Sequence, residues 1–276
     1  MITGWYFFSG SLQDSHLNDI KIGIHAAIHS QFDPKNIHVF LPLKEAADLN
    51  QLQTIFSNIN LHDVDNFESI IENHVIERLF VVVTGHGSPN GISISLDPAK
   101  YISPTNFVSV LSKITNLNQC IIVLGQCFSG IFNYIDLPTT PSFAILGATN
   151  LDSSLNDEAS EDLKLYVNVY LFYFFYWFFD PVDIDGDGKF SVLDAYKYAG
   201  CMTVKKLHAF RYKMYTDIDC IKDAIDKIKR SKTKDSFSEE ALRSKIRKNL
   251  EYIHSIQTPW ISNHILAQQV IIPRTP

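Results

Sequence analysis

Two short apolar runs, each leading directly to a chemically reactive side chain, constrain the fold of this chain more than any other feature. Leu79–Val83 is followed after two residues by His86, and Cys120–Leu124 is followed after two residues by Cys127. Runs of this length, rich in β-branched residues, are typical of buried strands in a parallel sheet. In open α/β sheets, ligands bind beyond the carboxyl ends of the strands. We therefore expect His86 and Cys127 to lie together at one edge of such a sheet.

The residue types at these two junctions are those of nucleophilic catalysis. A cysteine attacks as its thiolate, and a neighbouring imidazole can take up the proton and later protonate a leaving group. The unshielded N–H of Gly87, together with the N–H of Cys127, predicts an oxyanion hole. The two side chains are 41 residues apart, enough for one crossover helix, expected at 106–114. The alternative is an inert packing cysteine and an ordinary structural histidine.

Strand and helix patterns alternate along the rest of the chain. We expect strands at 2–10, 37–41 and 143–149, and helices at 15–30, 44–58, 66–77 and 166–179. This alternation predicts an α/β fold whose mainly parallel sheet is covered by helices on both faces. The pattern becomes helical and Lys-rich later, so we expect a main domain at 1–202 and a mostly helical extension at 203–276, with a last short strand at 270–272. The basic stretch 227–235 is either a solvated connector or a processing site.

The runs strand-Gly-His-Gly and strand-Gly-Gln-Cys-Phe-Ser-Gly, in this order, resemble the caspase–haemoglobinase group of cysteine peptidases. Within that group the chain is most similar to the legumain-like peptidases and their bacterial relatives, over about residues 1–200. The resemblance implies a caspase-like three-layer sandwich and a Cys127–His86 dyad that cleaves peptide bonds through an acyl-enzyme. Transfer of the same acyl group to an amine would make a peptide ligase or transamidase, which is a close variant.

The same resemblance implies residues for a substrate pocket. His16 matches a basic pocket residue of the family, although Ser15 stands where the family has arginine. Gln126, beside the cysteine, and Ser153 and Ser154, after the next strand, are the other residues expected there. The alternatives are a helix N-terminal surface residue for His16 and a solvated loop for the two serines. The family's third catalytic residue, an asparagine, has no match in this stretch.

A second motif, Asp183–Asp194, has the spacing of an EF-hand calcium loop. Gly188 at the sixth position permits the sharp turn, and oxygens at positions 1, 3, 5, 7, 9 and 12 can surround one hard cation. The expected ligands are Asp183, Asp185, Asp187, the Lys189 carbonyl, Ser191 and Asp194. An Asp in place of Glu at the last position has a shorter reach, so Mg²⁺ is the alternative to Ca²⁺. The competing interpretation is an acidic turn that caps a helix at 192–199.

Composition restricts the partners. A net charge of −6 argues against general nucleic-acid binding, and a peptidase would act on protein or peptide substrates. The apolar run 166–179 has 14 residues, fewer than the roughly 20 of a membrane helix, so no stable membrane insertion is expected. The absence of a signal-peptide pattern and of framework cysteine spacing favours a cytoplasmic setting. A catalytically silent, calcium-dependent interaction protein is the alternative function, and the sequence gives no oligomeric state.

Overall fold

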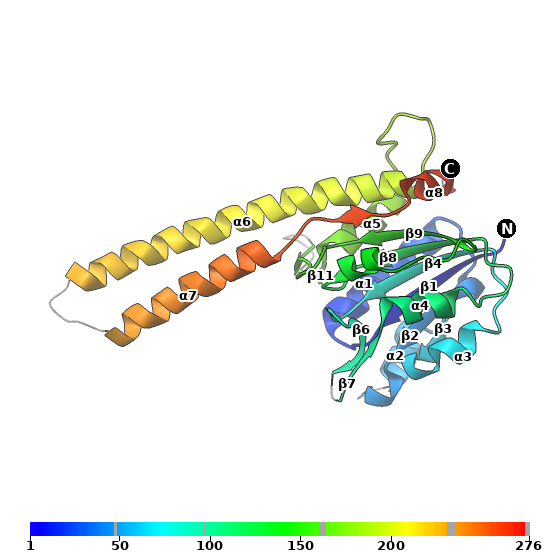
Figure 1. Ribbon diagram of the computed structural model, residues 1–276, viewed down its shortest axis with the longest axis horizontal. Helices are drawn as coiled ribbons and strands as arrows, with labels where there is room; N and C mark the ends of the chain where they lie inside the picture. Colours follow the sequence, from blue (N-terminus) through cyan, green and yellow to red (C-terminus); the bar gives the residue numbers. More distant parts are fainter. Residues whose placement is uncertain (47–48, 97, 160–163, 231–235, 274–276) are drawn as a thin grey trace.

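The computed structural model describes residues 1–46, 49–96, 98–159, 164–230 and 236–273. Its centre is a seven-stranded sheet in which every neighbouring pair but one is parallel (Figure 1). Across the sheet the strands lie in the order β12 (Trp260–Ile261), β9 (Ser142–Gly147), β8 (Gln119–Leu124), β4 (Arg78–Thr84), β1 (Thr3–Ser9), β2 (Ile37–Leu41) and β3 (Asn60–Asp63). Only β12 is antiparallel to its neighbour, β9. The chain thus has the predicted α/β architecture with a mostly parallel sheet.

The register of the parallel strands brings their carboxyl ends to one edge. Ser9 lies opposite Thr84, Val83 lies opposite Leu124, and Leu124 lies opposite Gly147. The segments that follow β1, β4, β8 and β9 therefore start side by side. This edge is called the carboxyl edge below.

Helices cover both faces of the sheet, and alternate residues of β1 enter the two cores because strand side chains point to opposite faces. Trp5 and Phe7 pack in the core beneath α1 (Asp14–His29), α2 (Leu49–Ile55) and α5 (Val169–Phe179). Tyr6 and Phe8 pack in the core beneath α3 (Phe67–Ile71) and α4 (Pro104–Leu111). The Trp5 ring also stacks on Phe80 of β4, with ring centroids 4.3 Å apart.

Several elements differ from the sequence expectations. β3 has no apolar run, and it is a strand only because it pairs with β2. The helix expected at 166–179 begins at Val169, since Tyr166–Asn168 forms β11, which pairs with β10 (Asn156–Glu158). The strand expected at 270–272 is wrong: that segment makes only an isolated bridge, and Trp260–Ile261 supplies the last strand of the sheet. Residues 47–48 of the helix expected at 44–58 lie outside the described residues.

A small antiparallel sheet between β4 and α4 is a further element that the sequence patterns did not predict. It consists of β5 (Gly87–Ser88), β6 (Gly91–Leu96) and β7 (Ala99–Ile102). The connection between the two reactive junctions therefore contains this sheet as well as the expected crossover helix, which is α4.

Two long helices extend well beyond the sheet as an antiparallel hairpin (Figure 1). They are α6 (Val192–Arg230), with 39 residues, and α7 (Ser236–Ser255), with 20 residues. The chain then returns to the sheet through β12 and α8 (His264–Gln269). The boundary expected at 202/203 falls inside α6, and residues 231–235 of the basic stretch lie outside the described residues. Within the described ranges, no helix is long and apolar enough to cross a membrane.

Candidate active site

A glycine turn shapes the junction after β4. Gly85 has φ of +104°, in the left-handed region that residues with a side chain rarely adopt. His86 follows directly, and its carbonyl accepts a 3.0 Å hydrogen bond from the Ser93 N–H of β6. The turn therefore redirects the chain immediately at the carboxyl edge, and the small sheet holds it there.

The two junctions touch through Gly87. A Cβ atom added to Gly87 would lie 2.1 Å from the carbonyl oxygen of Cys127 and 2.5 Å from Cγ of Gln126. Atoms cannot approach so closely without displacement, so glycine is what allows the His86 loop to reach the Cys127 loop. The structure thus brings together the two segments that the strand pattern places at one edge.

Helix α1 brings two side chains to His86. Nε2 of Gln13, the residue before the helix, lies 3.0 Å from Nε2 of His86. The buried His16 ring meets the His86 ring edge to face, with centroids 5.2 Å apart. Burial, and secondarily the charge of His86, lowers the pKa of His16 to about 4, so His16 is neutral at pH 7. His16 was expected here, whereas the contact of Gln13 spans 73 residues and no local pattern reveals it.

Cys127 is partly buried, and its loop is attached to the loop that follows β9. Its Sγ lies 3.7 Å from Oγ of Ser154. The next residue, Phe128, has a left-handed φ of 56° and donates its N–H to the carbonyl of Asp152 at 2.8 Å. Ser153 donates its own N–H and hydroxyl to the carboxylate of Asp152. Ser154 is therefore close to the thiol, while the hydroxyl of Ser153 is engaged within its own loop.

A buried polar network lies behind both junctions. The carboxyl group of Asp19, in α1, accepts hydrogen bonds from the Thr84 hydroxyl at 2.6 Å and the Asn168 N–H at 2.9 Å. The Asn168 amide in turn donates to the Gly125 carbonyl at 2.8 Å and to Oγ of Ser154 at 3.3 Å. Burial raises the pKa of Asp19 to about 8, although both hydrogen bonds oppose the shift. At neutral pH a largely protonated Asp19 thus connects α1 with the ends of β4 and β8.

Comparison with protein families identifies the chain. The sequence profile of the peptidase C13 family matches residues 47–187, just over half of the chain, and this range contains His86 and Cys127. The chain belongs to the peptidase C13 family. It is a legumain-like cysteine peptidase, a hydrolase whose substrates are proteins or peptides. A comparison with curated proteins found no match.

Two buried polar atoms of this C13 peptidase have no hydrogen-bond partner among the residues that the structure describes near the site. They are Nδ1 of His16 and Oε1 of Gln126. Buried polar groups are nearly always hydrogen-bonded, so each unpaired atom marks a position that a ligand or an ordered water can satisfy. Both residues belong to the set expected to line the substrate pocket.

The base of the helical hairpin packs against the segments around β10 and the start of α5. One small apolar cluster joins Leu207 of α6 and Ile256, the residue after α7, to Leu155, just before β10, and Val169, the first residue of α5. Burial raises the pKa of Tyr252, in α7, and Tyr166, Asp157 and Cys127 add to the effect through their charges. Tyr252 therefore lies within electrostatic reach of Cys127. No spacing in the sequence reveals this proximity, because only the return of α7 toward the sheet brings Tyr252 near Cys127.

The acidic loop brings three of its six expected ligands together. Ligand oxygens of Asp183, Asp185 and Asp187 all lie within 4.8 Å of one another. Gly186 and Gly188 have φ of +76° and +80°, and their N–H groups donate to the two carboxylate oxygens of Asp183. These two bonds hold the backbone of the loop against the Asp183 side chain.

Asp194, the last residue of the motif, does not belong to that group. Asp194 is buried at the start of α6, where its carboxylate accepts hydrogen bonds from the Ile184 N–H and from the N–H and hydroxyl of Ser191. Lys197 forms an ion pair with Asp185 at 2.8 Å. Asp194 therefore ties the two ends of the loop together, and Lys197 partly neutralises the acidic group.

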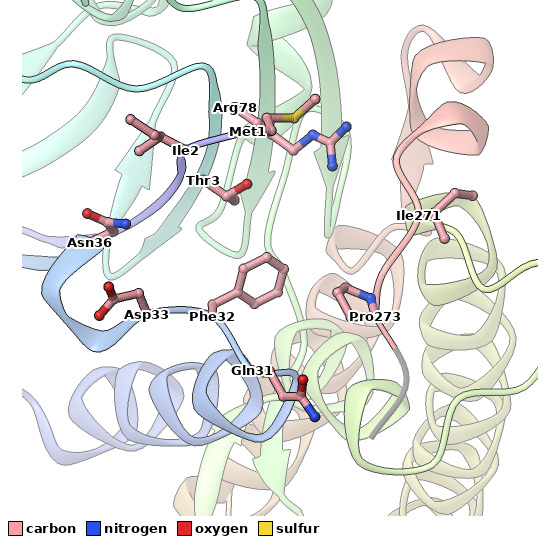
Figure 2. Close-up of a pocket in the computed structure, with 10 residues that line it drawn as sticks. All are labelled: Met1, Ile2, Thr3, Gln31, Phe32, Asp33, Asn36, Arg78, Ile271 and Pro273. Carbon is pink, nitrogen blue, oxygen red and sulfur yellow. The ribbon is translucent and has the colours of Figure 1, made fainter. Parts of the chain in front are cut away.

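A cavity lies at the opposite edge of the sheet from the carboxyl edge. It has a volume of about 500 Å³ and is lined by the first residues of β1 and β4, including Thr3 and Arg78, together with Phe32 and Pro273 (Figure 2). Because parallel strands start at the edge opposite to their carboxyl ends, this cavity is remote from the His86–Cys127 junctions. Its size does not make it the active site.

Proposed function

We propose that this C13 peptidase cleaves peptide bonds through an acyl-enzyme, with Cys127 as nucleophile and His86 as acid–base catalyst. The proposal rests on Gly87, which follows His86 in the sequence and packs against the backbone of Cys127. Gly87 thus places the His86 loop against the Cys127 loop. Attack of the thiolate on the scissile carbonyl would form an oxyanion, for which the N–H groups of Gly87 and Cys127 are the proposed donors. His86 would then protonate the leaving amine and later activate the water that releases the acyl group.

Gln13 is proposed to orient His86. Because the Gln13 amide occupies Nε2 of the imidazole, Nδ1 is the nitrogen left to exchange a proton with Cys127. For Nδ1 to accept that proton, Nε2 must carry a hydrogen. Gln13 would then accept this hydrogen through Oε1, which needs only a half-turn of its amide group. Gln13 thus takes a positioning role for which the sequence resemblance offered no residue.

For the substrate pocket we propose His16, Gln126, Ser153 and Ser154. The support is strongest for His16 and Gln126, whose buried unpaired atoms can bond to a substrate. It is good for Ser154, whose hydroxyl is 3.7 Å from the thiol. It is weakest for Ser153, since its hydroxyl already donates to Asp152. A neutral His16 would offer a hydrogen bond rather than a charge to the substrate side chain.

For the acidic loop we propose that it binds Ca²⁺, with Mg²⁺ as the competing ion. All the donors are oxygen atoms, which hard cations prefer, and three carboxylates are already gathered in a glycine-shaped turn, so the residues fit. Asp183, Asp185 and Asp187 would hold the ion first. The Lys189 carbonyl, Ser191 and Asp194 would complete the shell. The ion would stabilise the connection between α5 and α6 and take no part in the chemistry.

The experiment that tests the catalytic proposal is cleavage of a peptide library by the purified protein, with and without Ca²⁺. Cys127→Ala should reduce cleavage by at least about 10⁴-fold and leave the fold intact. A peptide bearing an acyl electrophile should label Cys127, and His86→Ala should abolish that labelling. Cys201→Ala is the matched control, since Cys201 is an exposed free thiol. Undiminished cleavage by Cys127→Ala would contradict the proposal, and absence of both cleavage and labelling would favour a silent interaction protein.

A further inference from the structure

Three histidines form a cluster at the β2–β3 edge of the sheet and have no role in the proposed catalysis. His38 lies in β2, His62 lies in β3, and His74 lies in the turn after α3. All three are partly buried. Because they come from three separate elements, no spacing in the sequence reveals that they meet.

The cluster is held by direct contacts. Nδ1 of His38 lies 2.9 Å from Nε2 of His62, and the planes of the two rings are nearly parallel, with an interplanar angle of 12°. The centroid of the His74 ring lies 4.3 Å from that of His38. Nδ1 of His74 also forms a hydrogen bond with the hydroxyl of Tyr6, which is completely buried in β1. Three imidazoles and one phenol thus form a continuous group.

We propose that His38, His62 and His74 bind a divalent transition metal, and that Zn²⁺ is the ion that fits best. Imidazole nitrogen is a preferred ligand of Zn²⁺, whereas Ca²⁺ and Mg²⁺ prefer oxygen. Three histidines with an open fourth position are an established arrangement for zinc. This site is separate from the acidic loop in place and in donor chemistry.

The protonation state of the cluster suits a metal. Metals bind neutral imidazole, so a proton on the ring competes with the ion. Burial, together with the charges of His74 and His62, lowers the pKa of His38 to about 3. Burial also lowers the pKa of His62 and of His74. Each of the three rings therefore binds a proton less readily than a free imidazole does.

Tyr6 would act on the metal through His74. A histidine ligand usually donates its second ring N–H to a nearby acceptor, which fixes the tautomer. If the Tyr6 hydroxyl accepts the hydrogen on Nδ1, the lone pair of His74 that remains for a metal is on Nε2. The bond between Tyr6 and His74 thus supplies the outer contact that a zinc site requires.

Binding requires a small rearrangement. The possible metal-ligand atoms are those of His, Cys, Asp and Glu side chains. Across the described part of the chain, only Asp183, Asp185 and Asp187 have three such atoms within 4.8 Å of one another, so the three histidines do not yet meet this condition. At least one imidazole must therefore turn, and the hydrogen bond between His38 and His62 must break. The bound ion would then tie the edge strand β3 and the turn after α3 to β2.

The test is a Zn²⁺ titration by calorimetry of the full chain carrying Cys127→Ala, with excess Ca²⁺ present. These conditions remove the catalytic thiol as a ligand and occupy the acidic loop. One saturable site is expected. His62→Ala and His74→Ala should each weaken Zn²⁺ binding by at least about tenfold, and His25→Ala, an exposed histidine of α1, should leave it unchanged.

A gentler variant separates binding from folding. Tyr6→Phe keeps the buried ring and removes only the hydroxyl, so it should fold and bind Zn²⁺ about 10- to 100-fold more weakly. Imidazole ¹⁵N chemical shifts, recorded on the Cys127→Ala protein without any histidine substitution, should move for His38, His62 and His74 when Zn²⁺ is added. The proposal is overturned if no saturable site appears, or if only the His16 and His86 signals move.

Discussion

The carboxyl edge and the acidic loop are built in opposite ways. At the carboxyl edge, side chains from α1 and from the segments after β4, β8 and β9 converge, and the Gln13–His86 contact joins residues 73 positions apart. In the loop, the bonds from Gly186 and Gly188 to Asp183 join residues three and five positions apart. The edge therefore depends on the register and packing of the whole sheet, whereas the loop depends mainly on its own backbone. Substitutions should be able to disturb one without the other.

Among the substitutions that separate the two regions, Gly87→Ala should have the largest effect. The new methyl group would lie 2.1 Å from the Cys127 carbonyl oxygen, so the two loops must move apart. A displacement of about 1 Å can reduce catalysis about 10²-fold, and forcing an extra methyl group into a packed site costs about 1–3 kcal/mol in the free energy of unfolding. Peptide cleavage and urea unfolding measure the two effects.

Gly200→Ala is the matched control for this substitution. Gly200 lies in α6, and a Cβ there meets nothing within 4 Å, so the change should preserve activity and raise the free energy of unfolding by about 0.5–1 kcal/mol. Calcium binding should be unchanged in both variants. Normal cleavage by Gly87→Ala would show that the edge tolerates the separation of its loops, and the comparison would fail.

This difference in construction also explains what the sequence could predict. The apolar runs before His86 and Cys127 predict their strands and their shared edge, because burial on both faces leaves a continuous local signal. The loop is likewise a local pattern. By contrast, β3 has the sequence Asn-Leu-His-Asp and becomes a strand only through pairing with β2. The positions of Gln13, Tyr252 and the histidine cluster could not be predicted in this way. Their contacts join segments that are far apart in the sequence, and no local residue pattern indicates such contacts.

The next largest effect concerns calcium. At a Ca²⁺ concentration 100 times the dissociation constant, binding to the folded state alone should raise the free energy of unfolding by about 2.7 kcal/mol. Asp185→Ala removes a ligand and should lose most of this increase. Lys197→Ala is the matched control, because it breaks the same ion pair and leaves all the acids in place. Unfolding with and without a chelator measures both.

The calcium experiment also tests the separation of the two regions. Lys197→Ala should respond to Ca²⁺ at least as strongly as the native protein, since it removes a competing cation. Single-turnover acylation of Cys127 should be the same in Asp185→Ala and the native protein at a temperature where both are folded. A changed acylation rate would mean that the loop controls the carboxyl edge.

A smaller effect is expected from Gln13→Ala. Loss of the contact with Nε2 frees the His86 ring to turn, so kcat should fall about tenfold while KM changes little. Gln13→Glu keeps the reach and the hydrogen-bond acceptor and should retain most of the activity. A fall in activity of the same size in both variants would indicate a merely structural role at the start of α1.

Asp19 gives the stability of the carboxyl edge a dependence on pH. Its pKa is raised from 3.8 to about 8 in the folded protein, so the native state retains a proton that the unfolded chain has released. The contribution of Asp19 to the free energy of unfolding is therefore complete below about pH 4 and is lost as the pH rises through 8. The slope is at most about −1.4 kcal/mol per pH unit within this window. The pKa of His16 is lowered from 6.5 to about 4 in the folded protein. Between these two pH values His16 therefore makes the free energy of unfolding rise with pH, which is opposite in sign to the effect of Asp19.

Asp19→Asn removes the pH-dependent contribution of Asp19 to the free energy of unfolding, because the asparagine amide does not titrate. Its side-chain oxygen can still accept from the Asn168 N–H. Its NH2 group can donate to the Thr84 hydroxyl, which reverses the bond that this hydroxyl donates to Asp19. Urea unfolding at pH values between 5 and 8 should show the variant gaining stability relative to the native protein as the pH rises, while Asp14→Asn, at the start of the same helix, follows the native profile. Parallel profiles for Asp19→Asn and the native protein would mean that Asp19 is ionised when folded. The polar network behind His86 and Cys127 would then hold a buried negative charge on Asp19. The hydrogen bonds from Thr84 and Asn168 supply no positive charge to balance it.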